Sequence, residues 1–136
     1  MNSPTAVAVT SFIAWTLALL VLMEAVRSKM VLAKEISANG FTPDNAGLSP
    51  FMRRLARAHA NCLEGLPIFG GLMLIALLTG RSSITDPLAF VLLAARLAQS
   101  GIHLSSVSST AVTLRFCAFA AQMAIAIYWA FRLLVG

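Results

Sequence analysis

Charged residues are scarce in this sequence. Aspartate, glutamate, lysine and arginine together make up 11% of its 136 residues, whereas a soluble domain carries about 25%. Hydrophobic residues make up 59%, compared with about 45–50% in a soluble domain. The shortage of charge excludes an ordinary water-soluble surface, and the chain has the length of one domain, so the composition indicates a polytopic membrane protein.

Cysteine is scarce too. Cys62 and Cys117 are the two cysteines, and both lie in apolar or near-apolar segments. They offer no paired spacing, which excludes a disulfide framework or a cysteine-based metal site. We expect both to pack as small hydrophobic residues, and we expect no metal site.

Charge is absent altogether from the first 23 residues, and the run Thr5 to Met23 is apolar and about as long as a bilayer requires. No basic segment precedes this run, and its nearest basic residues, Arg27, Lys29 and Lys34, follow it. This order disfavours a secretory signal, so we interpret the run as a membrane anchor.

Three further uncharged runs are shorter than the roughly twenty residues that a spanning helix needs: residues 65–80, 87–95 and 116–131. Their helices must therefore take in polar neighbours, among them Asn61, Glu64, Arg96 and Arg115. We predict a single all-α domain over residues 1–136, an integral membrane four-helix bundle. The expected helices cover residues 5–29, 50–80, 84–104 and 109–133.

The basic residues are unequally divided between the two sides of the predicted bundle. The opposite side offers only Arg81 and Arg132, while six basic residues lie in or beside the first loop: Arg27, Lys29, Lys34, Arg53, Arg54 and Arg57. The positive-inside rule then places this loop in the cytosol. The same asymmetry explains the net charge of +5 without a nucleic-acid partner.

The predicted second helix carries a polar stripe. Its members follow one another at spacings of four, four and three residues, which places them on one helical face: Arg53, Arg57, Asn61 and Glu64. Ionisable groups inside a membrane usually face a bundle interior or a wet cavity. They could form a buried ion network that joins helices, or line a binding site. Basic residues outnumber acidic ones at this depth, which favours an anion site: Arg27, Arg57, Arg96 and Arg115 against Glu24 and Glu64.

The stretch "RAHANCLEGLP", Arg57 to Pro67, resembles the second-helix signature of the MAPEG family, the membrane-associated proteins in eicosanoid and glutathione metabolism. That signature is Arg-Ala, an Asn after two more residues, a Glu three residues later and a Pro three further on. "AVRSK", "ARL" around Arg96 and "LRF" around Arg115 extend the resemblance over nearly the whole chain. The resemblance implies a homotrimer of four-helix bundles that binds glutathione between neighbouring subunits near the cytosolic side.

The resemblance also assigns roles to single residues. Arg115 matches the arginine that stabilises the glutathione thiolate, and a fixed guanidinium does lower the pKa of a nearby thiol. Arg115 is therefore the expected catalytic residue, and no metal cofactor is implied. Glutathione, the co-substrate, would be bound by seven residues: Arg27, Arg57, Asn61, Glu64, Arg96, Gln99 and His103.

The sequence departs from the family pattern at positions where family enzymes carry hydroxyl groups: Gly65, Gln99, His103, Phe116 and Phe119. His103 could donate a hydrogen bond where the family has a tyrosine, or cap the end of the third helix. His59 and Cys62 lie off the polar stripe. We expect His59 at the membrane interface and Cys62 in a packing role.

The sequence therefore favours a membrane-bound glutathione transferase or peroxidase that acts on lipophilic electrophiles arriving from the bilayer. The expected location is a bacterial inner membrane. The alternative is a non-catalytic MAPEG-type lipid-binding or scaffold protein, which the missing tyrosines favour. A small transporter would need a polar path across the membrane, and the outer halves of the helices, such as "LPIFGGLMLIALL", are apolar.

Overall fold

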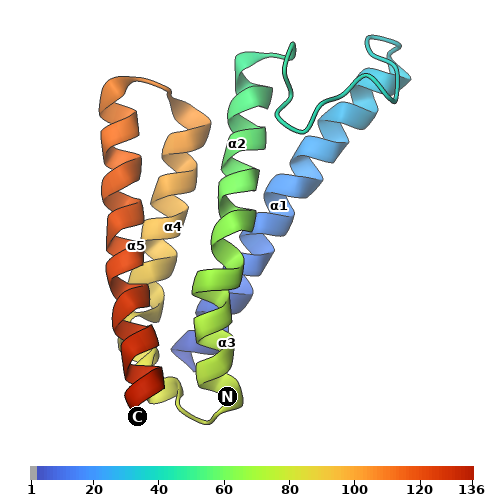
Figure 1. The fold of residues 1–136 in the computed structure, drawn as a ribbon. Helices are drawn as coiled ribbons and strands as arrows, with labels where there is room; N and C mark the ends of the chain where they lie inside the picture. The colour runs from blue at the N-terminus through green and yellow to red at the C-terminus, as the bar shows by residue number, and fades with distance from the viewer. Residues whose placement is uncertain (1–2) are drawn as a thin grey trace.

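The computed structural model of the chain describes residues 3–136, and within them it contains helices and no strands (Figure 1). A π-helical turn, Leu66–Gly70, joins the second and third helices, and a short 3₁₀ turn, Ser82–Ile84, precedes the fourth. The five α-helices are α1 Pro4–Leu32, α2 Pro50–Gly65, α3 Gly71–Leu78, α4 Asp86–Ser105 and α5 Ser109–Val135.

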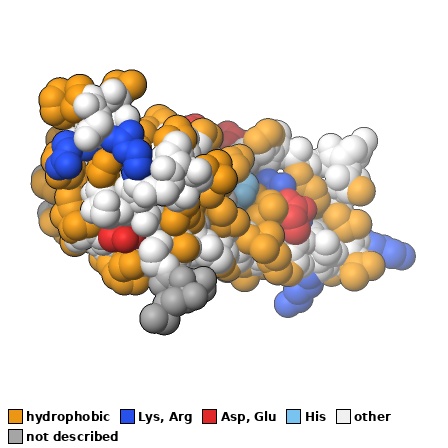
Figure 2. Space-filling view, turned by 90° about the horizontal axis from the view of Figure 1, so that it is seen from below, with side chains coloured by type: hydrophobic (Ala, Val, Ile, Leu, Met, Phe, Trp, Pro, Cys, Tyr) orange, Lys and Arg blue, Asp and Glu red, His pale blue; other side chains and the backbone are white. Residues whose placement is uncertain are grey.

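Four helical segments are long and apolar enough to cross a membrane, because α2, the π-helical turn and α3 form one continuous span, Pro50–Leu78. The other three spans are α1, α4 and α5. Hydrophobic side chains dominate the surface in Figure 2, and charged side chains occupy only a few places on it. The chain is a multi-pass membrane protein, and the predicted all-α class is confirmed.

The observed helices differ from the predicted ranges mainly at their ends. α1 continues to Leu32, beyond the predicted end at residue 29, and the chain turns where Lys34 adopts a φ of 59°. The second span ends at Leu78 instead of residue 80. Its π-helical turn, which contains Pro67, was not expected from the sequence. Proline has no N–H to donate to the carbonyl four residues earlier, so the helix widens there.

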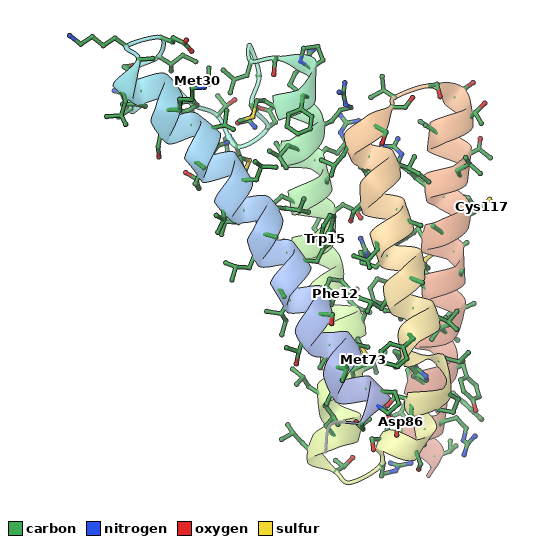
Figure 3. The ribbon with its side chains drawn as sticks, turned by 180° about the vertical axis from the view of Figure 1, so that it is seen from behind. Phe12, Trp15, Met30, Met73, Asp86 and Cys117 are labelled. Atoms are coloured by element: carbon green, nitrogen blue, oxygen red, sulfur yellow. The ribbon has the colours of Figure 1, made fainter. Side chains whose placement is uncertain are left out.

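The spans are not all parallel. α4 and α5 lie side by side along their length, whereas α1 leans away from the other helices toward the first loop (Figure 1). Phe12 on α1 and Met73 on α3 belong to the packed interior, and Figure 3 shows them in the half of the bundle that carries the termini. The divergence of α1 leaves room at the loop end for the first loop to fold back.

Hydrogen bonds fix the end of the bundle opposite the first loop. The backbone N–H of Thr5 and its hydroxyl both donate to Asp86 Oδ1, at 3.0 and 2.5 Å. The Arg81 guanidinium donates to the carbonyls of Leu133 and Arg132, at 2.7 and 2.8 Å. These contacts hold the start of α1 and the last turn of α5 to the α3–α4 connection.

The first loop, residues 33–49, is docked through a buried asparagine. Asn45 is fully buried with a φ of 56°, a conformation that asparagine tolerates better than most residues. Its Nδ2 donates to the Met52 carbonyl at 2.7 Å, and its Oδ1 accepts from Arg27 Nε at 3.0 Å. Asn45 therefore joins α1, the loop and α2.

A turn next to Asn45 is closed by an exposed aspartate. Asp44 Oδ1 accepts hydrogen bonds from the Thr42 hydroxyl at 2.6 Å and from the Ala46 N–H at 3.1 Å. These two donors, the Thr42 hydroxyl first, hold the pKa of the Asp44 carboxyl below its ordinary value because they stabilise the ionised form. The loop is thus a folded element with its own polar contacts.

Candidate functional site

Three helix ends meet at the loop end of the bundle: the start of α2, the end of α4 and the start of α5. Ser49 caps α2 by accepting from the Met52 N–H at 3.2 Å, and Ser108 caps α5 by accepting from the Ala111 N–H at 3.1 Å. A helix N-terminus carries a partial positive charge. Two such termini at one place favour a bound anion there.

A cavity of about 240 Å³ lies between these helix ends. Four arginines and a histidine contribute to its wall, and no acidic residue does: the lining consists of Pro50, Arg53, Arg54, Arg57, His103, Val107 and Arg115. Like charges held together without a counter-charge repel one another, so the cavity favours a ligand with more than one negative group. We refer to it as the arginine cavity.

Hydrogen bonds hold three of the basic groups of the lining in place. Arg115 Nη1 lies 2.7 Å from Nδ1 of His103, which is buried. Arg54 Nε donates to the Leu104 carbonyl at 2.7 Å and so ties α2 to the last turn of α4. The side chains of Arg53 and Arg57 are exposed and have no hydrogen-bond or salt-bridge partner in the described part of the chain. Their guanidinium groups are available to a ligand.

The arginine cavity brings together three of the eight residues predicted for the site: Arg57, His103 and Arg115. Two further arginines line it. The sequence places Arg53 on the polar stripe and both Arg53 and Arg54 among the basic residues beside the first loop, but it predicts neither as a ligand. The run "RRLAR" at residues 53–57 could have indicated both, since residues three and four apart on a helix are neighbours. The other five predicted residues lie outside this cavity.

Arg96 points into the bundle and is fully buried. Its Nη1 donates to Asn61 Oδ1, and its guanidinium carbon lies 5.3 Å from the Phe12 ring centroid and 5.5 Å from that of Phe69. These cation–π contacts partly replace solvation. Its Nε and Nη2 have no hydrogen-bond partner within residues 3–136. Arg96 and Asn61 thus contact each other, not the cavity.

The space for this guanidinium exists because residue 65 is glycine. A Cβ atom at Gly65 would lie 2.7 Å from Arg96 Nη2 and 3.1 Å from the Phe69 ring. The hydroxyl-bearing side chain that the family pattern has at this position could therefore not be accommodated beside Arg96 in its present position. The departure from the family pattern at residue 65 is coupled to the inward orientation of Arg96.

Three other predicted residues also lie outside the cavity lining. Gln99 is buried, and its Oε1 accepts from Gln122 Nε2 at 2.8 Å, which joins α4 to α5. Arg27 forms a salt bridge with Glu24 at 3.0 Å and holds the first loop. Glu64 lies midway along the second span, exposed, and makes no polar contact with any described residue.

The two cysteines and His59 occupy different environments. Cys62 is fully buried, in agreement with the expected packing role, and its Sγ lies 3.1 Å from the Ser100 hydroxyl. Cys117 is exposed on the outer face of α5 (Figure 3), contrary to the packing role expected for it. His59 is half-buried and does not line the arginine cavity. Residues 3–136 contain no group of three or more His, Cys, Asp or Glu side chains that could hold a metal ion.

The fold and the cavity together define a class: an integral membrane four-helix protein with a polycationic site at one end of its bundle. The chain belongs to the MAPEG family, whose family model matches residues 5–135. Comparison with curated proteins gave no match, and neither did comparison with solved structures.

Proposed function

We propose that the protein is a membrane-bound glutathione transferase, and that glutathione binds in the arginine cavity. The observation that carries the proposal is the cavity lining, in which four arginines lack any acidic partner. Glutathione has two carboxylates and, when activated, a thiolate, so it supplies the negative groups that this lining favours. Membership of the MAPEG family agrees with this ligand.

Within the cavity, the exposed guanidinium groups of Arg53 and Arg57 are suited to the two carboxylates, because a planar guanidinium binds a carboxylate through two parallel hydrogen bonds. Arg115 is suited to the sulfur. A positive charge beside a thiol favours its thiolate, and the thiolate is the attacking nucleophile. The second substrate would be a lipophilic electrophile from the bilayer. The same thiolate could serve to reduce a lipid hydroperoxide.

The exposed Glu64 supports a homotrimer. An unpaired carboxylate midway along a span costs about 2.5–3.5 kcal/mol on insertion scales, and no described residue of the same chain compensates it. A neighbouring subunit, or the amino group of glutathione held between subunits, would remove this cost. Native mass spectrometry should therefore detect three chains per particle, and a monomer would contradict the assembly. We further propose a bacterial inner membrane with the first loop in the cytosol.

The test of the function uses the purified protein in detergent. Glutathione should bind, an ultraviolet thiolate band should appear near neutral pH, and a generic electrophile should be conjugated. The Arg57→Gln variant should bind glutathione more weakly, while His59→Gln, which changes a residue outside the cavity, should not. Binding without a thiolate band or turnover would favour the non-catalytic lipid-binding alternative. Absence of glutathione binding would contradict the proposal.

A further inference from the structure

His103 and Arg115 form the closest side-chain contact inside the arginine cavity. Arg115 Nη1 and His103 Nδ1 are 2.7 Å apart. An arginine side chain only donates hydrogen bonds and keeps its proton in proteins. His103 Nδ1 must therefore be the acceptor, which requires a neutral imidazole that carries its hydrogen on Nε2.

The surroundings of His103 are uniformly positive. The positive groups around it are Arg115 on α5, Arg57 on α2 and Arg96 on α4. Arg53 and Arg54 on α2 line the same cavity. The helices packed around it contribute no nearby carboxylate: Glu24 on α1 pairs with Arg27, Glu64 is exposed midway along the second span, and Asp86 is bonded to Thr5 at the other end. A second proton on the imidazole would add one more positive charge to this group.

We propose that His103 is the positioning residue of Arg115: its neutral imidazole holds the guanidinium in the cavity, and protonation of the ring releases it. This inference rests on the proposed function, because the guanidinium is held for the glutathione thiolate. Arg115 Nη1 is used by His103, so the other N–H groups of Arg115 remain for the sulfur. The Nε2–H of the same ring supplies one further donor.

Protonation of His103 would act in two ways. The imidazolium cannot accept the hydrogen bond from Arg115, and it repels the guanidinium. Acidification would therefore remove the bound thiolate through two coupled protonations, one on the sulfur and one on His103. We expect the thiolate band of the wild-type protein to decline with pH more steeply than a one-proton curve.

Two substitutions separate positioning from simple packing. Asparagine at residue 103 can place its Oδ1 near the former Nδ1 and does not titrate. His103→Asn should keep at least half of the thiolate band and lose it along a one-proton curve. With glutathione at saturation, His103→Leu should lose the band to the level of Arg115→Ala. In the double variant, Arg115→Ala should add little to His103→Leu, because residues that act as a unit are not additive.

A readout without glutathione tests the contact directly. The chain has two histidines, so ¹⁵N-histidine labelling gives two ring systems, and His59→Gln assigns them. The His103 ring should show a neutral Nε2–H form at neutral pH, and Arg115→Ala should change its tautomer or titration. A charged ring or an Nδ1–H form in the wild-type protein would overturn the inference, whatever happens with glutathione.

The remaining outcomes are also decisive. A correct tautomer combined with an unchanged thiolate band in His103→Leu would overturn the positioning role and leave the proposed function intact. A correct tautomer in a protein that neither binds glutathione nor forms a thiolate would refute the proposed function and, with it, the role of His103 toward the sulfur.

Discussion

Arg115 is the seventh residue of α5, and its one hydrogen-bond partner in the described part of the chain is His103. At a position so close to hydrocarbon, a leucine would pack as well as an arginine. A negatively charged ligand would explain why an arginine occupies this position in a positively charged cavity. At the scale of single residues, the protein is organised around its arginines: four of them, Arg115 included, line the cavity, and Arg96 points into the bundle.

Replacement of Arg115 by alanine should separate binding from activation. Glutathione affinity should stay largely unchanged, because Arg53 and Arg57 are expected to hold the carboxylates. Turnover should fall about 100-fold or more, the size of effect that follows loss of a charge-stabilising donor, and the thiolate band should disappear. Arg115→Lys should recover part of the activity, since it keeps the charge without the planar fork. Stopped-flow absorbance and steady-state kinetics measure both quantities, and an undiminished band in Arg115→Ala would contradict the role.

A second prediction at this scale concerns Gly65. In Gly65→Ala the new methyl group would lie 2.7 Å from Arg96 Nη2 and 3.1 Å from the Phe69 ring, so these buried side chains must shift. Overpacking of this kind costs about 1–3 kcal/mol. Gly101→Ala is the matched control, because a Cβ there meets no atom within 4 Å. Thermal unfolding in detergent should show a lower midpoint for Gly65→Ala than for Gly101→Ala. Equal midpoints would mean that Arg96 moves aside without cost.

At the scale of elements, the first loop behaves as a docked part of the fold. Asn45 connects it to α1 through Arg27 and to α2 through the Met52 carbonyl. Its partners are the Arg27 guanidinium and a backbone carbonyl. Substitution of Asn45 would remove a hydrogen bond from each of them. The loop also borders the helix that carries the cavity arginines, so its docking bears on the position of α2.

Asn45→Ala should destabilise the protein by about 1.5–3 kcal/mol, the usual cost of losing hydrogen bonds to a charged group and leaving a buried group unpaired. The exposed Asn39 provides the matched control, since surface changes of this kind stay within about 0.5 kcal/mol. Limited proteolysis of the loop and thermal unfolding measure the two variants. Similar loop cleavage in Asn45→Ala and Asn39→Ala would contradict the docking role.

The turn at Asp44 should depend on pH. Its pKa in the folded loop lies below the unfolded value, so the ionised carboxylate contributes to the turn above the unfolded pKa, and the contribution disappears as pH falls through the folded pKa. An NMR titration of the Ala46 amide should report a pKa below the ordinary aspartate value. Thr42→Val removes the main donor and should raise it. An ordinary pKa in the wild-type loop would contradict the hydrogen bonds.

At the scale of the whole molecule, the four spans were predictable because one uncharged run is long enough to cross the membrane and the three shorter runs become long enough once their helices take in polar neighbours. The π-helical turn was not predictable, because a proline such as Pro67 can also kink or end a helix. The sequence also placed Asn61 and Arg96 near one depth without showing which helix each side chain faces. That choice depends on the space left at Gly65, which only the packed structure reveals.

The orientation of the bundle remains a prediction that labelling can test. Ala38 is exposed on the first loop, and Ser83 is exposed on the α3–α4 connection at the other end. The variants Ala38→Cys and Ser83→Cys are made in a protein from which both native cysteines have been removed. The excess of basic residues beside the first loop predicts that an impermeant thiol reagent labels residue 83, not residue 38, in intact cells. The reverse pattern would invert the topology.

The arginine cavity has a consequence for the handling of the purified protein. Anything that binds the folded chain and not the unfolded one raises apparent stability, by about 2.7 kcal/mol when its concentration is one hundred times its dissociation constant. A cluster of cations without a counter-charge makes buffer anions such ligands. Melting temperatures recorded in phosphate, sulfate and chloride should therefore differ at equal ionic strength. The ranking of the anions would describe the shape of the cavity before any substrate is known.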